Sequence, residues 1–231
     1  ETQGFINVEK IVKKCITERE LKMSQEILAR IKLEEPFYIK SALPSMFSWT
    51  ELENLLNLRP FINDSRFIIT NRSKEQTYQW PAQSWLSDIN TFPPKLLHDI
   101  VNEEVCYLRD CTRVNKKIND IADAIEKATG WPVDAHIYFS KKVKHEGFGR
   151  HKDRAHNLIV QSEGKSNFKV WSKHGENEVI NVDLEPGDCI FIPAKIYHKV
   201  LPLTPRVSVS LPMWILESAP AQDRYWISLT D

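Results

Sequence analysis

The sequence predicts a mainly β fold with added helices, in which a double-stranded β-helix (jelly roll) follows a helix-rich region. Six of the seven glycines lie at or after residue 130, and tight β-turns need glycine where φ is positive. From residue 133 onward, short apolar stretches alternate with turn-like segments at regular spacing, which is typical of a sandwich or barrel. These strands occupy so short a stretch that a compact jelly roll is the natural way to close them.

The first half of the chain carries helical patterns. Apolar residues recur at helical spacing between residues 7 and 33, which predicts one or two amphipathic helices ended by Pro36. Ser48 and Glu51 form a capping box that opens the next helix, and Gly130 is a helix stop. The elements expected after residue 33 are a strand at 37–39, a helix at 48–56, a strand at 66–70, and helices at 94–102 and 114–129.

The second half is predicted to be β. The expected strands span 134–140, 156–161, 167–172, 178–182, 189–193, 197–201 and 206–214. We expect residues 1–130 to form a helix-rich region that packs on the barrel and contributes edge strands. Residues 131–231 form the β-helix core, and the two parts make one compact unit.

Composition excludes some classes of function. The 31 basic and 31 acidic side chains balance, so no overall positive field attracts nucleic acid. A basic run between residues 141 and 154 is typical of a solvated face. The alternative interpretation is a surface that attracts an acidic substrate or RNA, although a nucleic-acid partner is not expected. No apolar run reaches the length of a membrane span and no signal peptide is visible, which predicts a cytoplasmic protein. The four cysteines form no CxxC pair, and buried free thiols are expected rather than a Cys106–Cys111 disulfide.

Three side chains point to a metal site. His151 and Asp153 are two residues apart, and on a strand residues i and i+2 face the same side. An imidazole and a carboxylate can therefore reach one metal ion, with His198 as the third ligand. Two histidines and one carboxylate on one face of a metal leave positions open, which suits Fe(II) that activates oxygen.

The context of the His-x-Asp pair strengthens this interpretation. A His-x-Asp pair alone also occurs by chance on surface strands. Here a turn at 186–188 is followed by an apolar strand that ends at Pro193. Such a strand returns the chain to the site just before His198, so the sequence predicts a metal centre built from His151, Asp153 and His198.

The same residues carry a family resemblance. The runs GFGRHKDRAHNLIVQSEGKSNFKVW (147–171) and LEPGDCIFIPAKIYHKV (184–200) resemble the JmjC and cupin-like 2-oxoglutarate oxygenases, above all the ribosomal-oxygenase and asparaginyl-hydroxylase branch. The resemblance is strongest over residues 131–211 and weaker upstream. It implies Fe(II), 2-oxoglutarate and O₂ as requirements. It also implies hydroxylation of a C–H bond, in a protein side chain or a small amino-acid-like substrate, with release of succinate and CO₂.

The sequence departs from this family at one position of the co-substrate site. The asparaginyl-hydroxylase branch carries a lysine or arginine fifteen residues after the first histidine, for the distal carboxylate of 2-oxoglutarate, and here that position is Ser166. Lys165 and Lys169 are neighbours, but their odd offset from 166 places them on the opposite strand face. A β-bulge would be needed to turn either lysine inward.

Arg206 offers another cation. Alternation places Arg206 and Ser208 on one face of a strand, and Val207 and Val209 on the other. Arginine grips a carboxylate with two parallel hydrogen bonds, and a serine hydroxyl adds a third. The pair resembles the Arg-x-Ser element of other 2-oxoglutarate oxygenases. The competing interpretation is that Arg206 forms a salt bridge on an outer strand.

Two further residues are candidates for the co-substrate site. Asn157 matches an asparagine near the co-substrate in the asparaginyl-hydroxylase branch, and Tyr138 lies on the preceding strand, from which its hydroxyl reaches the site. Both residues equally suit ordinary structural hydrogen bonding.

Two other classes of function remain open from the sequence. One is a metal-dependent cupin enzyme, an isomerase or a direct dioxygenase, that does not use 2-oxoglutarate. The other is a non-catalytic jelly-roll binding module.

Overall fold

The protein folds around two antiparallel sheets. The structure, a computed structural model, describes residues 18–56, 67–71, 74–77, 94–145 and 147–215. The larger sheet has the strand order β1-β9-β6-β11-β5-β4-β2-β3, and the smaller one the order β10-β7-β8. The expected mainly β class with added helices is confirmed.

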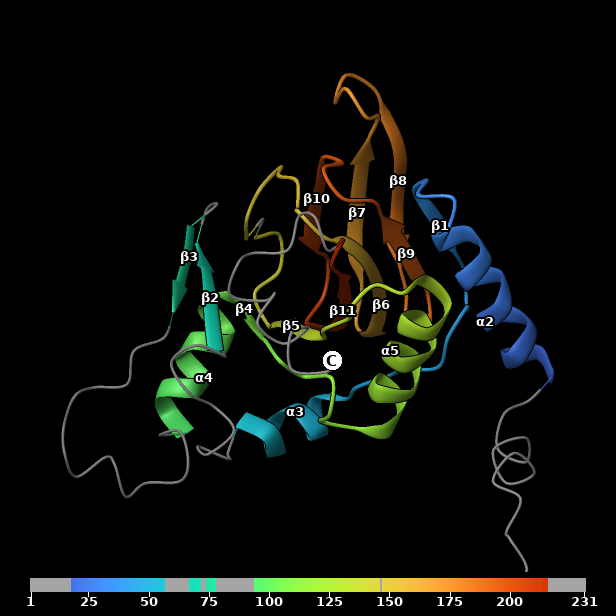
Figure 1. The fold of residues 1–231 in the computed structure, drawn as a ribbon. Helices are drawn as coiled ribbons and strands as arrows, with labels where there is room; N and C mark the ends of the chain where they lie inside the picture. The colour runs from blue at the N-terminus through green and yellow to red at the C-terminus, as the bar shows by residue number, and fades with distance from the viewer. Residues whose placement is uncertain (1–17, 57–66, 72–73, 78–93, 146, 216–231) are drawn as a thin grey trace, which may run out of the picture.

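In the described part of the chain, four helices and four short strands come first (Figure 1). They are α2 (Glu18–Ile31), β1 (Phe37–Ile39), α3 (Trp49–Leu56), β2 (Phe67–Asn71), β3 (Lys74–Thr77), α4 (Pro94–Glu103), β4 (Val105–Leu108) and α5 (Lys116–Thr129). Strands β3 and β4 were not predicted, and the part of the first expected helix before residue 18 lies outside the described residues. The boundary at residue 130 between a helical region and the core stays a prediction.

Both ends of each remaining strand agree with the prediction to within two residues. They are β5 (His136–Ser140), β6 (His156–Glu163), β7 (Ser166–Trp171), β8 (Glu178–Leu184), β9 (Cys189–Ile192), β10 (His198–Pro202) and β11 (Arg206–Met213). Strand β11 lies between β5 and β6 in the large sheet. Strand β1 pairs with β9 at one edge, and β4 pairs with β5 toward the other.

The helix ends follow local capping chemistry. Glu51 N donates to Ser48 Oγ at 3.1 Å and Ser48 N donates to Glu51 Oε2 at 2.8 Å, which is the predicted capping box of α3. Helix α5 begins at Lys116 because Asn115 is its N-cap and accepts from Ile118 N. Gly130 ends α5 with φ 74°, as expected.

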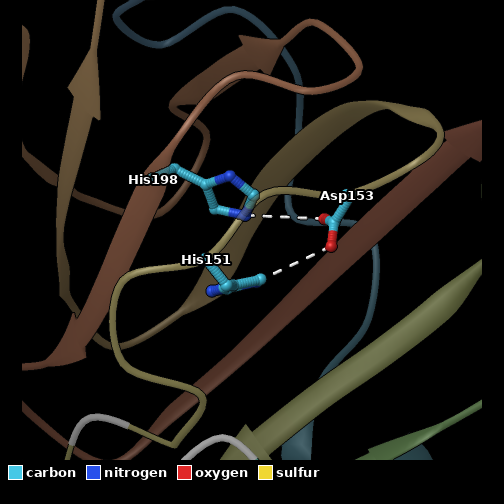
Figure 2. A group of neighbouring side chains, drawn as sticks. All are labelled: His151, Asp153 and His198. Atoms are coloured by element: carbon cyan, nitrogen blue, oxygen red, sulfur yellow. Dashed lines mark ion pairs between the residues drawn. The ribbon is translucent and has the colours of Figure 1, made fainter. Parts of the chain in front are cut away.

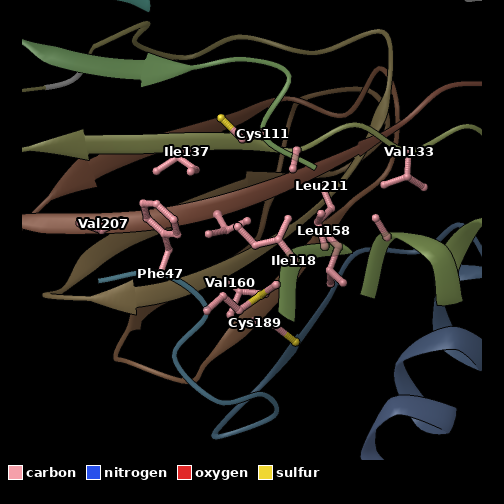
Figure 3. Packing of buried hydrophobic residues seen from close by; sticks show 14 of the residues in the cluster. Phe47, Cys111, Ile118, Val133, Ile137, Leu158, Val160, Cys189, Val207 and Leu211 are labelled. Carbon is pink, nitrogen blue, oxygen red and sulfur yellow. The ribbon is translucent and has the colours of Figure 1, made fainter. Parts of the chain in front are cut away.

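One hydrophobic core lies between the helices and the large sheet. Helices α2, α3 and α5 lie on one side of this sheet and the small sheet lies on the other (Figure 1). Val207 and Leu211 of β11 and Leu158 and Val160 of β6 point into the same space as Ile118 of α5 (Figure 3). Cys106, Cys111 and Cys189 are buried thiols that form no disulfide with one another, as the sequence predicted.

A second core fills the space between the two sheets. It includes Ile159 of β6 and Ile190 of β9 on the large sheet, and Phe168 and Val170 of β7 on the small sheet. Because both faces of the large sheet are buried, alternate residues of β6 and β11 serve different cores. Polar residues on the inner face of these strands therefore lie inside the barrel.

Among the described residues, no helix is long and apolar enough to cross a membrane.

Candidate metal centre and co-substrate pocket

The two histidines are held side by side by backbone pairing. His151 N donates to His198 O at 2.9 Å, and His198 N donates to His151 O at 2.8 Å. His198 opens β10, whereas residues 152–155 are not a strand. The expectation that His151 and Asp153 share a strand face was therefore wrong for Asp153. Asp153 lies instead in a segment between strands, where Lys195 N donates to Asp153 O at 2.8 Å and holds the backbone in place.

The three predicted ligands form one group. Their ligand atoms all lie within 4.8 Å of one another. His198 Nε2 lies 3.5 Å from Asp153 Oδ2, and His151 Nε2 lies 3.7 Å from Asp153 Oδ1 (Figure 2). One buried imidazole, one half-buried imidazole and one carboxylate thus face a common point.

Hydrogen bonds to backbone carbonyls orient both imidazoles for metal binding. His151 Nδ1 lies 3.0 Å from Gly149 O, and His198 Nδ1 lies 3.1 Å from Ile196 O. A carbonyl only accepts, so each Nδ1 carries the proton and each Nε2 directs a lone pair toward Asp153. Burial lowers the pKa of His198, which favours this neutral form. The donor set of two Nε2 atoms and a carboxylate fits a divalent iron site.

Asn157 supports the carboxylate. Its Nδ2 donates to Asp153 Oδ2 at 2.8 Å, and its Oδ1 accepts from Ser210 Oγ at 3.2 Å. The sequence suggested a place near the co-substrate for Asn157. The structure shows that the side chain positions Asp153 and lines the cavity described below.

Arg206 is a buried cation without a carboxylate partner among the described residues. Its exposed fraction is 4%, and Nη1 donates to Ser208 Oγ at 3.0 Å. Ser208 Oγ in turn donates to Gln161 Oε1 at 3.0 Å, and Arg206 Nε has no partner. Burial lowers the pKa of Arg206 to about 10. A buried guanidinium without an opposite charge is costly, so this site calls for an anion.

Metal-centre residues and Arg206 line one cavity. Its volume is about 570 Å³ including the solvent-open mouth, and its wall contains Asp153 and Arg206, with Phe168 and Val200 as apolar lining. Tyr138 also lines it, with its ring 5.9 Å from the Arg206 guanidinium carbon. The predicted face of β11 is thus confirmed, since Arg206 and Ser208 face the cavity while Val207 and Val209 join the other core.

The lysines considered as alternatives lie elsewhere. Lys165 pairs with Glu185, and Lys169 lies 3.2 Å from Glu178; neither lines the cavity. Ser166, which stands where related enzymes carry a cation, is fully buried and its hydroxyl has no partner among the described residues.

The sequence pattern missed some of the cavity wall. Gln161 stands behind Ser208 as its acceptor. Phe148 also lines the cavity. Parity along β6 was the available signal for Gln161, because Gln161 and Asn157 share one strand face.

Comparison with known proteins gives one family match. Residues 108–219 match the JmjC domain family. No curated protein sequence matches the chain.

Solved structures of an Escherichia coli ribosomal oxygenase, YcfD, share the fold. The complex with cobalt and succinic acid has a TM-score of 0.59 at 18% identity and covers 81% of this chain and 49% of that one. The complex with cobalt and 2-oxoglutarate has a TM-score of 0.57 at 19% identity and covers 84% of this chain and 50% of that one. The present chain therefore spans about half the length of these relatives.

Proposed function

We propose that the chain, whose residues 108–219 match the JmjC domain family, is an Fe(II)- and 2-oxoglutarate-dependent oxygenase. The observation that supports this most strongly is the buried, carboxylate-free guanidinium of Arg206 in the same cavity as His151, Asp153 and His198. The proposed reaction hydroxylates a C–H bond and releases succinate and CO₂.

His151, Asp153 and His198 would hold the iron. Bound iron and 2-oxoglutarate would supply the oxidising power, and the protein's own residues position and shield the reactants. Asn157 holds the Asp153 carboxylate in place. The apolar wall that includes Phe168 and Val200 limits the access of water.

Arg206 would bind the distal carboxylate of 2-oxoglutarate. Its Nε is free of protein partners, and Nη1 is already fixed by Ser208. The hydrogen bonds from Arg206 to Ser208 and from Ser208 to Gln161 orient the guanidinium in advance. A carboxylate is therefore bound with little further ordering of the side chain. Tyr138 would line the same subsite.

A protein side chain is the preferred substrate, with a small amino-acid-like molecule as the other option. Support comes from the fold shared with a ribosomal oxygenase. Localisation in the cytoplasm fits such a substrate and stays a proposal.

The experiment is an anaerobic titration of the Fe(II)-loaded protein with 2-oxoglutarate, followed by the visible metal-to-ligand charge-transfer band. We expect a band for the wild type and for Lys169→Ala, whose lysine pairs with Glu178 outside the cavity. Arg206→Ala should need far more 2-oxoglutarate for the same band.

A metal-dependent cupin enzyme without 2-oxoglutarate is the second candidate. Ser166 favours it, because this position lacks the cation of related enzymes. Bound iron without any charge-transfer band would contradict the oxygenase proposal and support this alternative.

A further inference from the structure

Cationic residues are concentrated in two neighbouring segments beside the metal centre, residues 150–154 and 195–199. We define this basic face by Arg150, Lys152, Arg154, Lys195 and Lys199, which lie in these two segments. The Arg150 guanidinium carbon lies 4.4 Å from the ring centre of Trp171 and 4.9 Å from that of Tyr197. Lys152 Nζ lies 5.2 Å from the ring centre of Tyr197.

Backbone pairing produces this face as the reverse of the metal centre. His198 faces the cavity, so Lys199, the next residue of β10, faces outward. The bridge between His151 and His198 places the 150–154 segment beside β10. Trp171 N donates to Tyr197 O at 2.9 Å, which places the end of β7 beside the segment that contains Tyr197. Segments far apart in the sequence therefore contribute to one surface.

Four of the five charges have no carboxylate partner in the described part of the chain. There, Arg150, Lys152, Arg154 and Lys195 form no ion pair with a carboxylate, and all four are exposed. Lys199 lies directly opposite Lys169 across the β10–β7 pair. Glu178 offsets Lys169 at 3.2 Å. The whole chain is neutral, so this positive surface is local and complements an anionic partner.

We propose that the basic face binds an acidic segment of the polypeptide substrate whose reacting side chain enters the adjoining cavity. This inference rests on the proposed function, since it assigns the chemistry of the substrate that the cavity would take. Carboxylates suit the guanidinium edge of Arg150 and the lysine ammonium groups.

Physical reasons favour a polypeptide over a single-stranded nucleic acid. Nucleic-acid platforms stack bases on open aromatic ring faces. Here Arg150 covers a face of Trp171, and both Arg150 and Lys152 lie over Tyr197. The rings hold the cations in place and leave few free faces for bases, whereas the cations stay available to carboxylates.

The test measures binding of fluorescein-labelled deca-glutamate, deca-lysine and a ten-uridine RNA to the full chain by anisotropy at low salt. The double variant Lys152→Glu/Lys195→Glu alters the basic face. The control Lys32→Glu/Lys127→Glu makes the same charge change at exposed positions at the end of α2 and on α5.

We expect deca-glutamate to bind the wild type, deca-lysine not to bind, and added salt to weaken binding. The basic-face variant should weaken deca-glutamate binding by roughly tenfold, because two surface ion pairs become two repulsions, while the control retains most of its affinity. Equal losses in both variants, or no deca-glutamate binding, would overturn the proposal. So would RNA binding as tight as that of deca-glutamate, which would assign the face to nucleic acid. None of these readouts requires iron or 2-oxoglutarate. The basic-face proposal can therefore fail while the charge-transfer titration supports the oxygenase, and the titration can fail while the basic face binds deca-glutamate.

Discussion

Replacing Arg206 with methionine should separate the stability of the protein from its binding of 2-oxoglutarate. Methionine keeps much of the side-chain volume and removes the charge. Burial lowers the pKa of Arg206 from 12.5 to about 10, which corresponds to a cost of about 3 kcal/mol for keeping the buried guanidinium charged without an anionic ligand. Removing that charge while preserving packing often stabilises a protein by about 1–4 kcal/mol.

The loss of Ser208's donor partner works against this gain. Ser208 Oγ keeps its bond to Gln161, so no buried hydroxyl hydrogen is left unpaired, and the lost bond costs about 1 kcal/mol. The ligand-free Arg206→Met protein should therefore be at least as stable as the wild type. The affinity for 2-oxoglutarate should fall by roughly 100-fold, because two charge-assisted hydrogen bonds worth about 1.5 kcal/mol each are lost.

Urea denaturation of the metal-loaded protein, under anaerobic conditions and with and without 2-oxoglutarate, measures both quantities. At 100 times its dissociation constant a ligand adds about 2.7 kcal/mol to the free energy of unfolding. The wild type should gain this amount, while Arg206→Met should gain little at the same concentration. A ligand-free variant destabilised by several kcal/mol, together with an undiminished gain from 2-oxoglutarate, would refute the assignment of Arg206 as an unpaired ligand-binding cation.

Three further substitutions test the site and the fold. Asn157→Ala should weaken divalent metal binding about 10- to 100-fold, because the Asp153 carboxylate loses the amide that orients it. Calorimetric titration with Co(II) measures this affinity. An unchanged affinity would show that Asn157 does not position the Asp153 carboxylate. Gly164→Ala should lower the melting temperature markedly, because its Cβ would lie 1.8 Å from the carbonyl oxygen of Pro205 at a φ of +69°; a variant that melts with the wild type would contradict this close approach. Ser48→Ala should lower the free energy of unfolding by about 1 kcal/mol, because the capping box of α3 is lost. The urea midpoint should fall, while 2-oxoglutarate binding remains as in the wild type. An unaltered midpoint would argue against a stabilising cap.

Strand β11 shows why part of the site was predictable. A strand buried on both faces has a period of two, so alternate residues must suit different surroundings. Val207 and Val209 suit the helix-covered core, whereas Arg206 and Ser208 suit a polar cavity. The Arg-x-Ser spacing alone therefore separated the two faces before any strand partner was known.

Other features did not follow from local patterns. Strand β4 (Val105–Leu108) has four residues, all buried, and so short an apolar run does not distinguish a strand from a buried loop or helix. The spacing of His151 and Asp153 predicted a shared metal group, but it did not show that Asp153 lies outside the strands. The basic run between residues 141 and 154 did not distinguish a solvated face from a substrate-binding surface, because its alignment with Tyr197 and Trp171 depends on sheet pairing.

By itself, the sequence determined the mainly β class, most of the helices and strands, and the identity of the three side chains that form the metal group. These follow from periodicity, capping and turn chemistry, which act over a few residues. Tertiary structure alone decided that Asn157 holds Asp153, that Gln161 accepts from a serine 47 residues away, and that Arg206 is buried without a carboxylate. These contacts depend on which strands pair and in what register, and the free energy that selects the register comes from burial across the whole barrel rather than from any local segment.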